Sequence, residues 1–233
     1  MYINSNEALS AQDVLLVPYC RHHVRAYHEW MQDADLREAT ASEELTIEEE
    51  YAMQESWRQD HDKLTFIVCK ALDSHSSSTQ ALRAGEADAA EHMVGDINLF
   101  LLNEDDDSTE QSILIGEIEL MIAQTKSRRQ GYGRAALLAF LEYVAARQAD
   151  ILEEHWTGIE ATHAVRPSNL AYLRVKINQV NNASISLFES VGFKLVSPTP
   201  NYFGELELRV SPDMYLPGGT PGRYQCLGYQ DDH

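Results

Sequence analysis

The sequence predicts a mixed α/β fold, because stretches with the two-residue periodicity of strands and stretches with helical periodicity both occur along the chain. Three predicted strands, at Leu64–Lys70, Met93–Leu102 and Ile113–Ala123, follow one another with only loops between them. Consecutive strands without an intervening helix favour an antiparallel meander. Amphipathic helices before and after this meander would cover the faces of the sheet.

Composition places the chain among folded proteins and disfavours several partners. The chain has 233 residues, of which 44% are hydrophobic, which is typical of one domain with its own core. A formal net charge of -19 disfavours nucleic acid and anionic lipid as partners and favours cationic ones. No stretch approaches the length and apolar character of a membrane span, and the N-terminus lacks the features of a signal peptide. We therefore expect an intracellular protein that is located in the cytoplasm, with the nucleus as a second compartment. We expect neither a membrane nor a nucleic acid as its partner.

Cysteine and histidine spacing gives no metal motif. Three widely spaced cysteines, Cys20, Cys69 and Cys226, suit a reducing compartment and form no zinc-type pair. His28 and Glu29 begin the pattern of a metalloprotease helix, but the required second histidine is replaced by Gln32. We expect no metal.

In the N-terminal part, Val14–Pro18 predicts a strand that ends at proline. Apolar residues then recur with helical spacing at Val24, Tyr27, His28 and Met31. The sequence from Thr46 to Glu49 is a capping box, so a second helix should run from there to about Asp60.

In the C-terminal part, residues 131 to 149 predict a helix rich in Ala and Leu. A strand at Tyr172–Ile177, a helix at Asn181–Val191 and strands at Lys194–Val196 and Gly204–Val210 follow. The patterns divide the chain into a single domain, residues 1–211, and a C-terminal tail, residues 212–233, that is frayed or packed over the domain. Residues 73–91 and 103–111 predict loops, and residues 150–170 read as an insertion.

The junction between the third meander strand and the next helix indicates an anion site. Four of the 18 basic residues fall within the nine positions from Lys126 to Arg134. A glycine-containing turn that opens a helix presents unpaired backbone N–H groups, which suit a pyrophosphate. The spacing excludes a P-loop and lacks the third glycine of the dinucleotide fingerprint. An ordinary basic turn remains the alternative.

A second pattern follows this R-x-x-G-x-G turn: Asn181, Ser184, Leu187-Phe188 and Gly192-Phe193. Together the two patterns resemble the acetyl-CoA-binding core of the GCN5-related N-acetyltransferase (GNAT) superfamily. The stretches YHEWM, TASEELTIEEEYAMQESW, DKLTFIV, MVGDINLF and GEIELMIA resemble the eukaryotic N-acetyltransferase 9-like family, related to ribosomal-protein alanine acetyltransferases. The resemblance implies a twisted, mostly antiparallel sheet, flanked by helices, whose fourth and fifth strands splay apart.

The resemblance also implies which residues bind acetyl-CoA. The turn would hold the pyrophosphate through Arg128, Arg129, Gln130, Gly131, Tyr132, Gly133 and Arg134. The strand end at Leu120, Met121 and Ile122 would hydrogen-bond the pantetheine arm. On the following helix, Asn181, Ser184 and Phe188 would lie against the cofactor, with simple capping as the alternative for Asn181.

Two glutamates are candidate catalytic residues. Glu117 and Glu119 lie on one face of the strand that leads to the cofactor site, and a carboxylate there would take the proton of an attacking amine. The alternative is a pair of solvated strand glutamates. Many superfamily members have a tyrosine where this chain has Phe188, and phenylalanine cannot protonate the departing thiolate. Ser184 and Tyr172 are candidate substitutes.

The resulting expectation is an enzyme that transfers acetyl directly from acetyl-CoA to a protein or peptide amine. An N-terminal α-amino group is favoured, a lysine side chain stays open, and the resemblance suggests a link to tubulin and microtubules. The alternative is a weak or inactive acetyl-CoA-binding adaptor on a protein partner. An enzyme for small amines ranks third.

Overall fold

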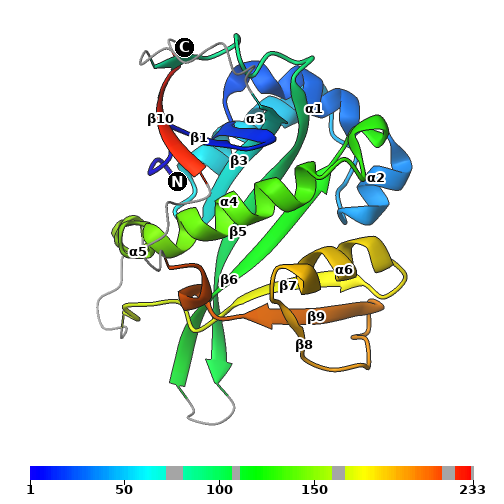
Figure 1. Ribbon diagram of the computed structural model, residues 1–233, viewed down its shortest axis with the longest axis vertical. Helices are drawn as coiled ribbons and strands as arrows, with labels where there is room; N and C mark the ends of the chain where they lie inside the picture. The colour runs from blue at the N-terminus through cyan, green and yellow to red at the C-terminus, as the bar shows by residue number, and fades with distance from the viewer. Residues whose placement is uncertain (72–80, 107–110, 159–165, 217–223, 232–233) are drawn as a thin grey trace.

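The computed structural model describes residues 1–71, 81–106, 111–158, 166–216 and 224–231 (Figure 1). The strands are β1 Glu7–Ala11, β2 Val14–Pro18, β3 Lys63–Lys70, β4 Leu82–Arg83, β5 Met93–Asp106, β6 Gln111–Ile122, β7 Leu173–Asn178, β8 Lys194–Leu195, β9 Glu205–Val210 and β10 Tyr224–Gln230. The helices are α1 Val24–Trp30, α2 Ala34–Ala39, α3 Ile47–Gln59, α4 Tyr132–Ala146, α5 Gln148–Thr157 and α6 Asn182–Ser190. Short 3-10 turns occur at Arg21–His23, Thr125–Ser127 and Pro212–Tyr215.

The strands form one sheet in the order β4-β10-β1-β2-β3-β5-β6-β7-β9-β8. Within the described residues, only the β10–β4 and β6–β7 pairs are parallel. The predicted meander is confirmed, since β3, β5 and β6 pair antiparallel in chain order. The predicted mixed α/β class with a mostly antiparallel sheet is therefore confirmed.

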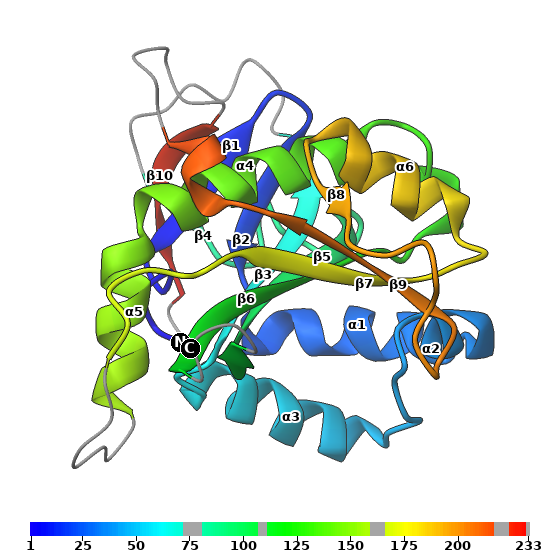
Figure 2. The same ribbon diagram turned by 90° about the horizontal axis from the view of Figure 1, so that it is seen from below.

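Helices cover the sheet on both faces (Figure 2). One hydrophobic cluster joins α4 to the sheet, where the Phe66 ring meets Phe140 and Tyr143 edge to face. A second cluster joins α1 to the opposite face and includes Tyr27 and Met121. The helix predicted after Thr46 is α3, and the Thr46 hydroxyl accepts the Glu49 N–H as the capping box requires.

Alternation along β5 and β6 divides the side chains as predicted. Ile97 and Leu99 of β5 and Ile118 of β6 pack under α4. Asp96 and Asn98 of β5 lie on the face covered by α1 and α3, and they are buried there. This second face is polar beside the end of β6, which sets the position of the candidate site.

The acidic stretch after Leu102 was predicted as a loop, and this was wrong for residues 103–106. The β5–β6 ladder continues to Asp106 and Gln111. Two donors reach this end of the hairpin, since Arg174 of β7 and Tyr172, the residue before β7, both donate to Glu104. These contacts offset the acidic charge that argued against a strand. Residues 107–110 lie outside the described part of the chain.

Two further segments are more ordered than their composition indicated. In the loop predicted at 73–91, residues 82–83 form β4, and Asp88 is only 1% exposed; residues 73–80 lie outside the described part. In the insertion predicted at 150–170, α5 buries Ile151 and Leu152; residues 159–165 lie outside it. Each segment is held by remote partners, which local patterns do not reveal.

The C-terminal tail is also part of the sheet over residues 224–230. These residues form β10, which pairs antiparallel with β1 from Tyr224–Ala11 to Gly228–Glu7. The tail is therefore neither frayed nor merely draped over the domain in this segment. Within the described ranges, no helix has the length and apolar character required to cross a membrane.

Candidate acetyl-transfer site

β6 and β7 are neighbours in the sheet but pair over only two residues before they diverge, and we call this divergence the β6–β7 gap (Figure 1). Within the described residues, β6 pairs with β7 only at Gly116 and Glu117, and the Gly116 N–H donates to Tyr172 O at 3.1 Å. Beyond Glu117, β6 continues beside β5 alone. The splayed pair of central strands is therefore present.

Backbone alternation determines which groups of β6 face the gap. Because Gly116 points toward β7, Leu120 and Ile122 direct their N–H and C=O groups to the same side. Met121 points the other way, since a Cβ atom on Gly95 of β5 would lie 1.8 Å from the Met121 carbonyl oxygen. Of the three residues predicted to bind the pantetheine arm through their backbone, Met121 is therefore turned away.

The turn after β6 ends in a left-handed glycine. Gly131 has φ +94° and lies immediately before α4. The first bond within this helix runs from the Ala135 N–H to Gly131 O at 3.0 Å, so the amides of residues 132–134 have no acceptor inside the helix. A helix N-terminus with free amides binds phosphate groups well.

The basic side chains of this turn have different roles. Arg128 donates from Nε to Ile122 O at 2.9 Å and from Nη2 to Ala123 O at 3.2 Å, so it fastens the turn to the end of β6. Arg129 and Arg134 are exposed. Gln130 is also committed locally, because its Nε2 donates to Lys126 O.

Helix α6 lies beside the start of α4. A Cβ atom on Gly133 would meet the Leu187 side chain at an ordinary 3.5 Å, so protein packing alone does not demand glycine there. Asn181 caps α6, with Oδ1 accepting the Ser184 N–H at 3.1 Å. Phe188 is 3% exposed and packs edge to face on Phe193, with ring centroids 5.1 Å apart.

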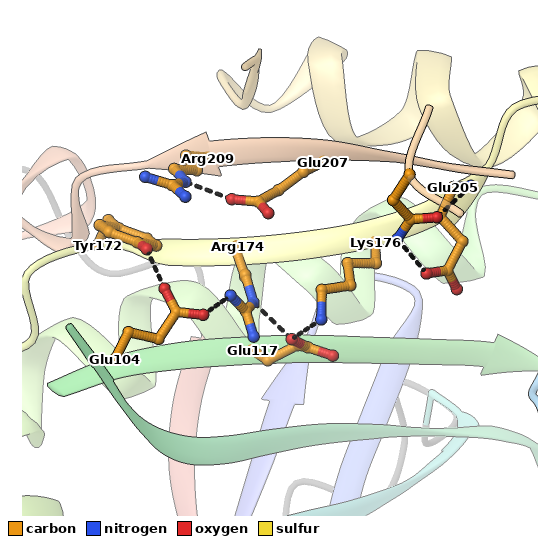
Figure 3. A network of polar contacts seen from close by, with 9 residues as sticks. Glu104, Glu117, Tyr172, Arg174, Lys176, Glu205, Glu207 and Arg209 are labelled. Atoms are coloured by element: carbon orange, nitrogen blue, oxygen red, sulfur yellow. Dashed lines mark hydrogen bonds and ion pairs between the residues drawn. The ribbon is translucent and has the colours of Figure 1, made fainter. Parts of the chain in front are cut away.

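Glu117 belongs to a network of ion pairs on the polar face of the sheet (Figure 3). Its Oε2 accepts from Arg174 Nε at 2.5 Å and lies 3.4 Å from Lys176 Nζ. Arg174 also donates to Glu104, and its side chain is only 7% exposed. Glu117 is therefore occupied in holding two cations of β7.

Tyr172 is part of the same network. Its hydroxyl donates to Glu104 at 2.6 Å, and burial together with this bond raises the pKa of Tyr172 to about 12. The Arg209 guanidinium stacks over its ring, 4.0 Å from the centroid. The proton of Tyr172 is thus directed to a carboxylate, which argues against its predicted role as a general acid.

Glu119 has a different environment from Glu117. It lies opposite Asn98 of β5, and it is exposed to solvent at the edge of the polar face. Loss of hydration, followed by the negative charges of Asp96 and Glu117, raises the pKa of Glu119 to about 7, against the opposing effect of Lys63. An accessible carboxylate with this pKa has the properties of a general base at neutral pH.

Comparisons with known proteins agree with this geometry. A family model described as "Acetyltransferase (GNAT) domain" matches residues 13–194. The Drosophila melanogaster protein named alpha/beta-tubulin-N-acetyltransferase 9 is 42% identical over 97% of this chain and 99% of its own. The Schizosaccharomyces pombe N-acetyltransferase 9-like protein is 37% identical over 90% of this chain and 98% of its own. The chain belongs to the GNAT acetyltransferase family.

Solved structures show the same fold at low sequence identity. A GNAT-family acetyltransferase from Bacillus anthracis superposes with a TM-score of 0.57 at 15% identity, over 88% of this chain and 99% of that one. A ribosomal L7/L12 α-N-protein acetyltransferase in complex with coenzyme A gives 0.55 at 13% identity, over 87% and 96%. The enzyme is thus an acetyltransferase with the GNAT fold.

The acetyltransferase has backbone groups that suit acetyl-CoA. The free amides at the start of α4 lie beside the edge of β6 and beside α6, because the Cβ position of Gly133 is within 3.7 Å of the side chains of Leu120, Ile122 and Leu187. The Ile122 carbonyl accepts from Arg128, so the Leu120 backbone and the Ile122 N–H are the groups that face away from β5 without a strand partner among the described residues. Gly131 is required there by its positive φ. The residues present therefore fit a pyrophosphate joined to an extended amide-containing arm.

The structure adds residues that sequence analysis missed. Below Glu119, the buried Asp96 accepts from Asn98 at 2.9 Å and from the Tyr27 hydroxyl at 3.3 Å. Burial raises the pKa of Asp96 to about 6, although those hydrogen bonds lower it. Among the described residues, Asn98 Oδ1, Thr65 Oγ1 and the Tyr19 hydroxyl are buried without a hydrogen-bond partner. Sequence analysis placed Tyr27 on an apolar helical stripe, and that pattern gave no sign that its hydroxyl meets Asp96.

Proposed function

We propose that this enzyme transfers acetyl from acetyl-CoA to the N-terminal α-amino group of a protein. The observation that carries the proposal is Glu119, an exposed carboxylate with a pKa of about 7 on the strand that borders the β6–β7 gap. Around it lie a helix N-terminus for phosphate and an open strand edge for the pantetheine arm. The general base, the acetyl-CoA site and the acceptor amine would thus lie together where β6 and β7 diverge.

The pKa of Glu119 suits an α-amine better than a lysine. An α-ammonium group has a pKa of about 8 and a lysine ammonium one of about 10.4. Glu119, at about 7, lies roughly one pKa unit below the first and more than three below the second. An ordinary glutamate, near 4.3, would be a poor acceptor for either proton. This matching favours the α-amino group.

The reaction follows from the placement of these groups. The amides at the start of α4, with Arg129 and Arg134, would hold the pyrophosphate, while the Leu120 backbone and the Ile122 N–H would hydrogen-bond the pantetheine arm. When bound, acetyl-CoA supplies the activated acetyl carbonyl. Glu119 takes a proton from the acceptor ammonium, directly or through water, and leaves a neutral amine that can attack. Transfer would thus need donor and acceptor bound together.

The protein acceptor is suggested by relatives. Alpha/beta-tubulin-N-acetyltransferase 9 from Drosophila melanogaster and from Homo sapiens are 42% and 39% identical to this chain. Tubulin is therefore the first protein substrate to test. The net charge of -19 favours an acceptor segment that carries positive charge, which an α-ammonium group provides.

A weak or inactive acetyl-CoA-binding adaptor is the second candidate function, and two observations favour it. Phe188, at the position of the usual tyrosine, is packed into the core, and the Tyr172 hydroxyl donates to Glu104. Protonation of the thiolate would then fall to solvent or to Ser184, which is half-buried beside the cofactor opening. The adaptor retains acetyl-CoA binding without turnover.

One experiment separates these functions. The purified enzyme and its Glu119→Gln variant are incubated with acetyl-CoA and two peptide pools, one lysine-free with free N-termini, the other blocked at the N-terminus with internal lysines. Mass spectrometry reads acetylation, and calorimetry reads acetyl-CoA binding. We expect acetylation of the first pool by the wild type, loss in the variant and equal acetyl-CoA affinity in both. Acetylation of the second pool alone would refute the α-amine assignment. Binding without any acetylation, including of tubulin dimers, would favour the adaptor.

A further inference from the structure

A cluster of metal-ligating side chains lies at the turn that precedes α1. Cys20, His22 and His23 each offer one ligand atom, the Cys20 Sγ and one ring nitrogen from each imidazole, and these atoms all lie within 4.8 Å of one another. Cys20 and His23 are buried, while the His22 side chain is 23% exposed. The cluster belongs to neither the β6–β7 gap nor the turn before α4.

A buried carboxylate already organises both imidazoles. Asp88 Oδ2 lies 3.1 Å from His22 Nε2 and 3.0 Å from His23 Nε2, and it accepts the Tyr229 hydroxyl at 2.5 Å. The other oxygen of Asp88 accepts the Gly85 N–H at 2.7 Å. Asp88 therefore occupies the Nε2 atom of each imidazole, and a metal bound at either Nε2 would replace the proton that this nitrogen shares with the carboxylate. The two rings are therefore held close together with no metal bound.

A second carboxylate has an unused oxygen in the same place. Asp231, immediately after β10, has a buried Oδ1 with no hydrogen-bond partner among the described residues. The Asp231 side chain is hydrogen-bonded to the Cys20 thiol. Asp231 therefore faces the Cys20 sulfur and keeps one buried oxygen whose loss of hydration a cation would offset.

We propose that Cys20, His22 and His23 bind a zinc-class divalent cation, with Asp88 and Asp231 as the flanking carboxylates. Thiolate and imidazole are the ligands that zinc prefers, and the carboxylates offset the charge of the ion. His23 Nδ1 accepts the Cys20 N–H at 3.0 Å, so His23 would bind the metal through Nε2, in place of the proton that it now shares with Asp88 Oδ2. Binding releases the thiol proton of Cys20 and any proton on a ligating nitrogen.

The ion would cross-link three distant segments. The ligands stand before α1, Asp88 follows β4, and Asp231 and Tyr229 belong to the C-terminal segment that pairs with β1. Cys20 and Asp231 also line an open cleft of about 440 Å³, which gives a path for the ion. The site would therefore stabilise the attachment of β10 without taking part in acetyl transfer. Sequence analysis missed it because neither the zinc-type cysteine pair nor the H-E-x-x-H pattern describes one cysteine followed by two adjacent histidines.

Zinc binding by the full, untagged chain tests the proposal. The protein is titrated with Zn²⁺ in competition with a chromophoric chelator, and Co²⁺ is used as a spectroscopic probe of thiolate coordination. We expect one ion per chain, at least tenfold weaker binding in Cys20→Ser and in His22→Gln, and unchanged binding in the control Cys226→Ser, whose exposed thiol lies outside the cluster. The cobalt–thiolate band should be absent in Cys20→Ser and present in the control.

Stability gives a readout that is independent of spectroscopy. Zn²⁺ at about 100 times its dissociation constant should raise the unfolding midpoint of the wild type and the control by about 5–10 °C and leave the two ligand variants unmoved. His22→Gln keeps the proposal testable if Cys20→Ser folds poorly, because His22 is partly exposed. Absence of stoichiometric binding, or binding that both ligand variants retain, would overturn the proposal.

Discussion

Replacing Glu119 with glutamine tests the central chemical assignment. The substitution keeps the size of the side chain and removes its capacity to take a proton. General-base catalysis contributes about 10²–10⁴-fold, so kcat should fall by that factor. The matched control is Glu117→Gln, because Glu117 lies two residues earlier on β6 and its side chain is on the same face of the sheet. Because Glu117 already holds Arg174 and Lys176, its removal should lower kcat only a few-fold.

The size of the pH effect follows from the pKa of Glu119. With a value of about 7, about one tenth of the carboxyl is ionised at pH 6 and about nine tenths at pH 8. The contribution of this base to kcat should therefore rise about tenfold over that range. The rising limb of the pH profile should disappear in Glu119→Gln. It should persist in Glu117→Gln with its midpoint at lower pH, because the charge of Glu117 also raises the pKa of Glu119.

Initial rates at saturating acetyl-CoA and saturating N-terminal peptide, from pH 5.5 to 9, give this profile. Calorimetric acetyl-CoA binding, run in parallel, should be the same in all three proteins. A Glu119→Gln enzyme with wild-type kcat and an unchanged pH limb would refute the assignment. An equal loss in both variants would show that the ion-pair network, and not a base, limits the rate.

The same substitution has a signature in stability. The pKa of Glu119 is raised in the folded state from 4.5 to about 7, so the native protein binds this proton more tightly than the unfolded chain. Its contribution to stability is therefore unfavourable above about pH 7 and fades as the pH falls to about 4.5. Glu119→Gln should raise the unfolding midpoint at pH 8 and leave it unchanged at pH 4.5. A lower midpoint at pH 8 would contradict the raised pKa.

Four further outcomes are expected. Asp96→Asn removes a negative charge that raises the pKa of Glu119, so the midpoint of the kcat–pH profile should move to lower pH; a fixed midpoint would contradict this coupling. Gly131→Ala forces a side chain into φ +94° and should cost about 1–2 kcal/mol in chemical denaturation while weakening calorimetric acetyl-CoA binding. Gly95→Ala places a Cβ atom 1.8 Å from a carbonyl oxygen of β6 and should cost more than about 4 kcal/mol or prevent folding, as circular dichroism would show. Deletion of residues 224–233 exposes the edge of β1 and should cause aggregation, measured by light scattering; a monodisperse product would contradict it.

The sequence predicted the central part of the fold because that part has strong local patterns. The strand β3 is a continuous β-branched and aromatic run, and β5 and β6 alternate. Helix α3 begins with a capping box, and α4 is rich in Ala and Leu. The pairing of the three strands is also local in sequence, so a meander follows from order alone. The R-x-x-G-x-G turn was found for the same reason, since its glycine and basic residues are contiguous.

Segments held by remote partners could not be predicted in this way. Strand β10 pairs with β1, more than 200 residues earlier in the chain, and β4 has only two residues. Neither has enough length for a periodic signal. Asp88 is another case, since its burial depends on His22 and His23 from one segment and on Tyr229 from another. No local pattern distinguishes it from the exposed acids around it.

The choice between Glu117 and Glu119 shows where sequence reasoning ends at the site. Alternation places both carboxylates on one face, and it gives no reason to prefer either. The difference arises from β7, which pairs with β6 as far as Glu117 and then diverges. Strand pairing therefore brings Arg174 and Lys176 to Glu117, and the splay leaves Glu119 without such partners.

The acidic surroundings of Glu119 link acceptor binding to proton transfer. In the absence of an acceptor, Asp96 and Glu117 make ionisation of Glu119 unfavourable, which raises its pKa. The same carboxylates attract an ammonium group, and the arriving positive charge favours the ionised form of Glu119. Transfer of the proton then neutralises both partners at once, leaving an uncharged amine beside an uncharged acid. The neutral amine is therefore formed at the site to which Asp96 and Glu117 attract the acceptor ammonium. A lysine ammonium would be attracted equally well, but its higher pKa opposes the transfer, so we expect the preference for α-amines to appear in kcat more than in KM.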